Sequence, residues 1–180
     1  MPESRFQVAR PDFSASIEGE ARLLLLIDAF SRGQDALQGR TKLAKLDFLL
    51  RYPAFFHRAL MIRNIASPLP EPDASESTIE QRMVRFRYGP WDPAYYALLG
   101  SLVGRGLIRA IPQRRFIAFQ TTEPGRALAR NLASTDVWSD VAQRARLLKR
   151  AFPTQGGTFV KDFIYLHFPE VTKANWGERL

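Results

Sequence analysis

The sequence contains no cysteine and only two histidines, His57 and His167. The absence of cysteine excludes a disulfide scaffold, cysteine-based zinc fingers, iron–sulfur clusters and thiol catalysis. Neither histidine has another histidine three or four positions away, so the usual spacing of a zinc site is missing. We therefore expect a protein without a metal or cofactor.

Long apolar runs are also missing. The run from Leu23 to Ile27 is far shorter than the roughly eighteen residues that a membrane span needs. Residues 1–10 carry charges and Pro2 rather than the apolar centre of a signal peptide. These features predict a soluble, cytoplasmic protein that does not contact a membrane.

The sequence lacks the short motifs of the common enzyme classes. There is no GxSxG, no GxxxxGK[ST] and no GxGxxG, so acyl transfer, nucleotide hydrolysis and dinucleotide redox chemistry lack their minimal parts. The acidic residues near the N-terminus, such as Asp12 and Glu18, lie on or before a predicted helix rather than converging as in a two-metal nuclease. We expect no catalytic residues.

What the sequence has is basic charge in one place. The chain of 180 residues has a net charge of +8, and 46% of its residues are hydrophobic, enough for one sizeable core. Residues 79–150 hold thirteen basic and five acidic side chains, which accounts for the whole excess. Twelve of the thirteen are arginine, whose planar fork suits phosphate or carboxylate. An anionic partner and a solvated basic face both fit this pattern.

The first half of the chain predicts three helices. Ser16 can cap a helix whose first turn holds Glu18 and Glu20. Residues 31–39 are rich in turn formers and predict a loop. Apolar residues recur at helical spacing in residues 41–52, and a third helix follows Pro53 over residues 54–64.

The next part predicts a connector, a short strand and another helix. Residues 67–78 are rich in proline, serine and acids and predict a flexible loop. Residues 78–87 alternate weakly, as in a short strand, and residues 88–93 (YGPWDP) predict a rigid turn in which Asp92 caps a helix over 93–105. The aromatic residues Tyr88, Trp91, Tyr95 and Tyr96 fit core packing better than base stacking.

A β-hairpin gives the clearest indication of the fold. Two alternating segments, residues 107–111 and 116–120, flank a tip that contains Arg114 and Arg115. A further helix is expected to begin at Thr121 or Thr122. Helices followed by a basic hairpin and a closing helix predict a winged helix-turn-helix that is mainly α, with the hairpin as a small β wing and additional N- and C-terminal helices.

The domain division follows from these elements. We predict an N-terminal arm over residues 1–15, a winged-helix domain over 16–135 and a C-terminal helical extension over 136–180. In the extension, residues 136–152 predict a basic helix that turns Val137, Val141, Ala145 and Leu148 inward. An apolar segment follows over 159–168. A winged helix does not need the extension, which we therefore expect to pack on a partner.

Two blocks of the sequence resemble a known family. Residues 40–53 (RTKLAKLDFLLRYP) and residues 85–92 (RFRYGPWD), continuing through Tyr95 and Tyr96 to residues 105–108 (RGLI), resemble the middle components of bacterial ABC-ATPase three-component conflict systems. The small accessory subunit of Lamassu-type anti-phage defence is similar. The resemblance covers roughly residues 40–130 and implies a non-catalytic winged-helix subunit that bridges an SMC- or Rad50-like ABC ATPase and an effector, commonly a nuclease. It also implies antiviral or anti-plasmid defence in a complex that senses foreign DNA.

Three functional hypotheses remain. The leading one is this accessory subunit, and the others are a DNA-binding winged-helix transcription regulator and an antitoxin-like protein-binding module. The helix over 93–105 offers few side chains for base readout, which weakens the regulator. The candidate phosphate contacts are Arg105, Arg109, Arg114, Arg115, Arg126 and Arg130. The candidate protein-interface residues are Lys42, Lys45, Arg51, Phe163, Tyr165 and Trp176.

Overall fold

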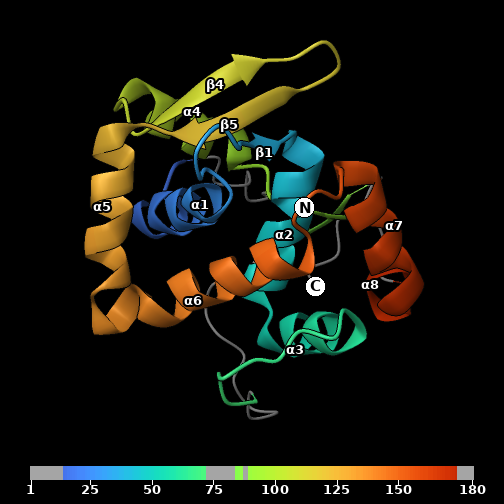
Figure 1. Ribbon diagram of the computed structural model, residues 1–180. Coiled ribbons are helices and arrows are strands. Elements are labelled where there is room, and N and C mark those ends of the chain that lie inside the picture. Colours follow the sequence, from blue (N-terminus) through green and yellow to red (C-terminus); the bar gives the residue numbers. More distant parts are fainter. Residues whose placement is uncertain (1–13, 72–83, 87–88, 174–180) are drawn as a thin grey trace, which may run out of the picture.

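The computed structural model describes residues 14–71, 84–86 and 89–173 of the chain. These residues form a mainly helical structure with a small antiparallel sheet, which confirms the predicted fold class at this level (Figure 1). The helices are α1 (Ile17–Ala29), α2 (Arg40–Arg51), α3 (Pro53–Ile62), α4 (Tyr95–Gly104), α5 (Glu123–Ala133), α6 (Asp136–Ala151), α7 (Gly157–His167) and α8 (Pro169–Lys173). The strands are β1 (Leu37–Gln38), β2 (Val84–Phe86), β3 (Gly89–Trp91), β4 (Ile108–Pro112) and β5 (Ile117–Thr121).

The helix starts follow the capping residues of the sequence. The Ser16 hydroxyl accepts a 3.0 Å hydrogen bond from the Gly19 amide and so begins α1. The Thr122 hydroxyl accepts one from Gly125 at 3.2 Å and begins α5. Pro53 occupies the first turn of α3, where a proline costs no helical hydrogen bond. At the far end of α4, Gly106 takes a φ of 69°, which ends the helix.

The predicted hairpin forms, and a third strand joins it. β4 and β5 pair antiparallel from Ile108↔Thr121 to Pro112↔Ile117, and the Gln113 amide donates to the Phe116 carbonyl across the turn at 2.8 Å. β1 adds to the other edge of β5 through Leu37↔Phe119. The prediction of a loop over residues 31–39 is therefore wrong for Leu37 and Gln38, which form a strand.

A second correction concerns the predicted turn over residues 88–93. Residues Gly89–Trp91 form β3, which pairs antiparallel with β2 in the register Val84↔Trp91. The predicted strand over 78–87 is thus confirmed for Val84–Phe86, while residues 72–83, 87 and 88 lie outside the described part. α4 begins at Tyr95, two residues after the predicted start at Pro93.

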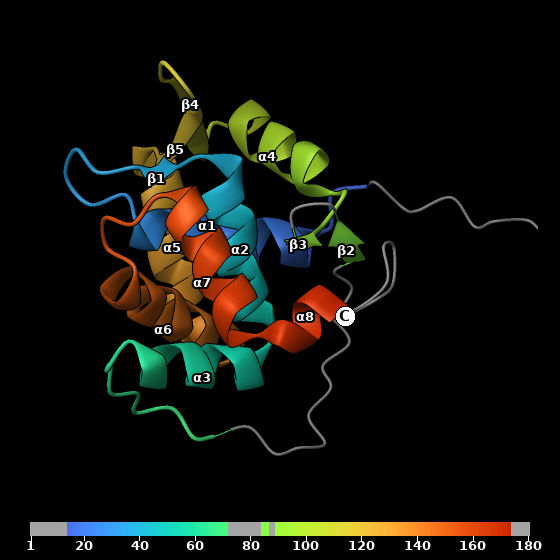
Figure 2. The ribbon, with the colours of Figure 1, turned by 90° about the vertical axis from the view of Figure 1, so that its right-hand side faces the viewer.

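The last helices belong to the same hydrophobic core as the first. α6 packs on α1 and α5, and α7 packs along α2 (Figure 2). Leu148, Phe152 and Ile164 have no exposed surface. The predicted extension thus packs on its own chain, while the division into an arm, a winged helix and an extension stays a prediction. Val137 is 78% exposed and does not point inward; its neighbour Trp138 contacts the core instead.

None of the described helices combines the length and the apolar character that crossing a bilayer requires.

Candidate functional site

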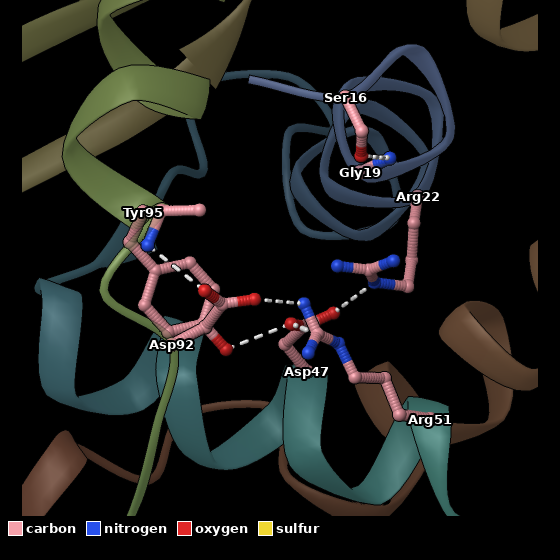
Figure 3. A network of polar contacts seen from close by, with 8 residues as sticks. Ser16, Gly19, Arg22, Asp47, Arg51, Asp92 and Tyr95 are labelled. Atoms are coloured by element: carbon pink, nitrogen blue, oxygen red, sulfur yellow. Dashed lines mark hydrogen bonds and ion pairs between the residues drawn. The ribbon is translucent and has the colours of Figure 1, made fainter. Parts of the chain in front are cut away.

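A buried network of charged side chains lies where α1, α2 and the start of α4 meet (Figure 3). Asp47 of α2 is fully buried. Its Oδ1 accepts a 2.7 Å hydrogen bond from Arg22 Nε of α1, and its Oδ2 accepts one of the same length from the Tyr95 hydroxyl of α4. The carboxylate therefore joins three helices.

Arg51 extends this network to the segment before α4. Its Nε lies 3.1 Å from Asp47 Oδ2, in ion-pair contact without the geometry of a hydrogen bond. Its Nη2 donates to Asp92 Oδ2 at 2.5 Å. The other oxygen of Asp92 accepts from the Ala94 amide at 2.8 Å, just before the first residue of α4. Asp92 thus supports the start of α4, as the sequence predicted, and also pairs with α2.

The contacts within the network keep Asp47 and Arg51 charged and Tyr95 neutral although all three are buried. Burial alone would raise the pKa of Asp47, but Arg22 and Arg51 outweigh it and hold that pKa below its ordinary value. Burial works against the charged form of Arg51 as well, yet Asp47, Tyr95 and Asp92 together raise its pKa. Burial and the neighbouring Asp47 raise the pKa of Tyr95 well above 10, so the phenol stays protonated and can donate.

Two lysines of α2, Lys45 and Lys42, are buried as well, and neither forms an ion pair with a described acidic residue. Lys45 Nζ donates to the Pro90 carbonyl of β3 at 3.1 Å. Burial, with a smaller effect of Lys161, lowers its pKa to about 7. Lys42 lies over the Phe30 ring with its Nζ 4.8 Å from the centroid, and burial together with Lys149 lowers its pKa to about 8.

The two sequence blocks that carry the family resemblance therefore contact each other. Lys45, Asp47 and Arg51 come from residues 40–53, and their partners Pro90, Asp92 and Tyr95 come from the second block. Charged residues in these blocks hold α2 against β3 and α4. Their role in the folded chain is structural, which explains why such polar residues occupy a central helix.

This geometry corrects most of the predicted protein interface. Lys42, Lys45 and Arg51 are buried inside the chain and do not form a charged surface. Phe163 is buried too, with its ring 5.1 Å from that of Phe152. Tyr165 of α7 is half-buried and packs against the core. Trp176 lies outside the described residues. The prediction was wrong for Lys42, Lys45 and Arg51 because the sequence did not show that α7, α1 and β3 cover α2, and wrong for Phe163 because α7 turns this ring toward Phe152.

The six arginines predicted to contact phosphate divide into two groups. Arg105 pairs with Glu20 of α1 at 2.8 Å, and Arg109 donates to the Gln120 side chain from both Nε and Nη2, so these two are held by their own chain. The other four are exposed and form no ion pair with a described residue; they are Arg114 and Arg115 at the hairpin tip and Arg126 and Arg130 one turn apart on α5.

The outer face of α4 is apolar. Tyr96 is 62% exposed and Val103 is 41% exposed, and a Cβ added at Gly100 or Gly104 would meet open space. Tyr95, in contrast, lies in the core with Trp91 packed edge-on 5.1 Å from it. The core assignment of the aromatic run is thus confirmed for these two residues. Tyr96 points outward, with the Arg40 guanidinium 5.1 Å above its ring.

The described residues contain no group of three or more histidine, aspartate or glutamate side chains able to hold a metal ion. Comparison of the chain with protein-family models, curated proteins and solved structures gave no match. The resemblance to ABC-ATPase conflict systems therefore stays a prediction from the sequence.

Proposed function

We propose that this protein is a non-catalytic accessory subunit that bridges an SMC- or Rad50-like ABC ATPase and an effector, commonly a nuclease, in an anti-phage or anti-plasmid defence complex. Its proposed fold is a winged helix in which α4 takes the place of the recognition helix and β4 and β5 form the wing. The observation that carries the protein-binding role is the exposed apolar face of α4, formed by Tyr96, Gly100, Val103 and Gly104.

The composition of this face favours protein contact over base readout. Base-specific contacts come mainly from arginine, lysine, asparagine or glutamine, and α4 has none of these between Tyr95 and Gly104. An exposed tyrosine beside small residues is typical instead of a protein interface, because aromatic rings supply contact area and glycines admit a close approach. The arginine that follows, Arg105, is already paired with Glu20.

DNA contact is a second candidate function, carried by different residues. Arg114 and Arg115 extend from the hairpin tip, and neither has an acidic partner among the described residues. Guanidinium groups in such a position fit the phosphate backbone, and the binding would be independent of sequence and strongly dependent on salt. Such contact is compatible with a role inside an ATPase complex that lies on DNA.

The test is co-purification of the tagged protein with the products of its neighbouring genes. We expect a large ATPase and a second subunit in fixed ratio with the wild-type chain, and loss of at least one of them from the Tyr96→Glu/Val103→Glu variant. Val137→Glu is the control, since Val137 is an exposed apolar residue as well but lies on α6. Purification of the wild-type chain alone, or equal recovery with both variants, would contradict the proposal.

A further inference from the structure

A small cleft opens where the end of α1 meets α5 and α6. Four of the nine residues that line it are alanines, and these small side chains leave about 40 Å³ of free space between the helices. Arginines from three separate elements stand around it: Arg32 just after α1, Arg130 on α5 and Arg146 on α6. The full lining is Leu25, Asp28, Ala29, Arg32, Ala129, Arg130, Ala133, Ala142 and Arg146.

The described residues do not balance the charge of this arginine cleft. Asp28 is the one acidic residue in the lining, and its carboxylate accepts a 3.1 Å hydrogen bond from the Thr121 hydroxyl. None of the three arginines forms an ion pair with a described residue, whereas Arg22, Arg51, Arg58 and Arg105 all do. Arginine stays charged at any ordinary pH, so the lining carries an excess of two positive charges.

The volume of the cleft and the positive charge of its lining together limit which ligands it could hold. About 40 Å³ is room for roughly three water-sized groups, since one such group needs about 10–15 Å³. A phosphate group presents a similar number of oxygens, while a base or sugar would remain outside. Guanidinium forks donate pairs of hydrogen bonds to phosphate oxygens, and arginines from three separate elements line this one cleft.

We propose that the arginine cleft, formed by Arg32, Arg130 and Arg146, binds a phosphate group. The group belongs either to a nucleic acid backbone or to a small phosphate compound, because both present the same oxygens. This site lies on α1, α5 and α6, apart from the outer face of α4, and it does not depend on the proposed assembly role. Of the three arginines, only Arg130 was among the phosphate contacts predicted from the sequence. Arg32 and Arg146 are new candidates.

The experiment measures the binding of two probes to three proteins, each made as the full chain. Inorganic phosphate and a short DNA duplex are titrated separately, by calorimetry at low ionic strength, into the wild type, an Arg32→Gln/Arg130→Gln/Arg146→Gln variant and an Arg144→Gln/Arg150→Gln/Lys173→Gln control. The control removes the same number of basic charges from α6 and α8, at positions that do not line the cleft. Circular dichroism melting confirms that the three proteins are folded.

The cleft variant is expected to lose phosphate affinity by roughly tenfold or more, because each lost guanidinium removes charge-assisted hydrogen bonds. The control is expected to stay close to the wild type. If duplex binding falls selectively in the cleft variant, the source is a nucleic acid backbone; if only inorganic phosphate binding falls, the source is a small phosphate compound. Equal affinities of the cleft variant and the control for both probes, or no binding of either probe by the wild type, would overturn the proposal.

A second variant tests the same site in the opposite direction. Asp28→Asn removes the negative charge of the lining and keeps an oxygen that can accept from Thr121. Phosphate affinity is expected to rise a few-fold, roughly as expected for removal of one like charge near a surface site. A misfolded protein cannot show this gain, and an unchanged or reduced affinity of the folded variant would contradict the site.

Discussion

The Tyr95 hydroxyl donates a 2.7 Å hydrogen bond to Asp47, a residue 48 positions earlier in the chain. Both side chains are buried, so the hydrogen bond connects α4 and α2 away from the bulk solvent. Arg22 and Arg51 flank the same carboxylate. One acidic side chain is therefore shared by two guanidiniums and a phenol, and the packing of three helices depends on it.

Replacing Asp47 should destabilise the protein strongly. The Asp47→Asn variant leaves two buried guanidiniums without their shared counter-charge, a change that typically costs about 3–5 kcal/mol. Urea unfolding followed by circular dichroism measures the loss. Glu170→Gln is the control, because it breaks the ion pair with Arg58 in which both side chains are partly exposed, and such pairs contribute up to about 1 kcal/mol. Equal losses in the two variants would show that the buried network does not stabilise the fold.

Lys45 should make stability depend on pH. Its pKa is about 7 in the folded protein and 10.5 in the unfolded chain, so above about pH 7 the folded state binds fewer protons than the unfolded state. The free energy of unfolding should therefore rise with pH from about 7 to about 9, by about 2 kcal/mol from this residue alone, since one pKa unit corresponds to about 1.4 kcal/mol. Lys42 adds to the rise above about pH 8.

The Lys45→Met variant isolates this effect. Methionine binds no proton, so the variant lacks the rise in the free energy of unfolding that Lys45 gives the wild type between pH 7 and pH 9. The amount by which the variant is more stable than the wild type should therefore be smaller at pH 9 than at pH 7. A Lys173→Met control changes an exposed residue of α8 and should run parallel to the wild type. Parallel pH profiles of the wild type and Lys45→Met would contradict the lowered pKa.

Replacing Gly125 and Gly100 with alanine should change the stability of the fold in opposite directions. A Cβ at Gly125 would lie 1.8 Å from the Leu107 carbonyl oxygen, so Gly125→Ala has to push α5 away from the start of β4 and should cost about 3 kcal/mol. Gly100 lies in α4 with open space around it, and Gly100→Ala should raise stability by about 1 kcal/mol through helix propensity. Thermal melts of both variants check the contrast, and a neutral Gly125→Ala would mean that α5 is not held there.

The hairpin tip should contribute to DNA binding if the second candidate function holds. The Arg114→Glu/Arg115→Glu variant is expected to lose duplex affinity and to lower the slope of log affinity against log salt by about two, because each phosphate contact contributes about one. Arg114→Lys/Arg115→Lys keeps the charges and should retain most of the affinity. Fluorescence anisotropy over a range of salt concentrations measures both, and an unchanged slope would remove the hairpin from any DNA contact.

Local signals in the sequence were enough to place most elements. Ser16, Pro53 and Thr122 marked the starts of α1, α3 and α5, since capping depends on residues close in sequence. The hairpin of β4 and β5 was visible for the same reason. β1 was not, because Leu37 and Gln38 become a strand only through pairing with β5, some eighty residues later.

The charged residues of α2 were misplaced for a related reason. Periodicity shows one apolar face of a helix, and charged residues off that face are expected at the surface. In α2 the other faces are covered as well, by α1, β3 and α7, and the partners of Lys45 and Arg51 lie about forty positions away. The arginine cleft was missed because it forms only where α1, α5 and α6 converge.

The central position of α2 also constrains the order of events during synthesis on the ribosome. α2 is made early, but the helix that packs along it, α7, is made more than a hundred residues later. Until α7 leaves the exit tunnel, the polar and apolar side chains of α2 on that side stay in contact with water. Nascent chains arrested before residue 157 should therefore be more sensitive to protease, and more readily bound by chaperones, than chains released after residue 173.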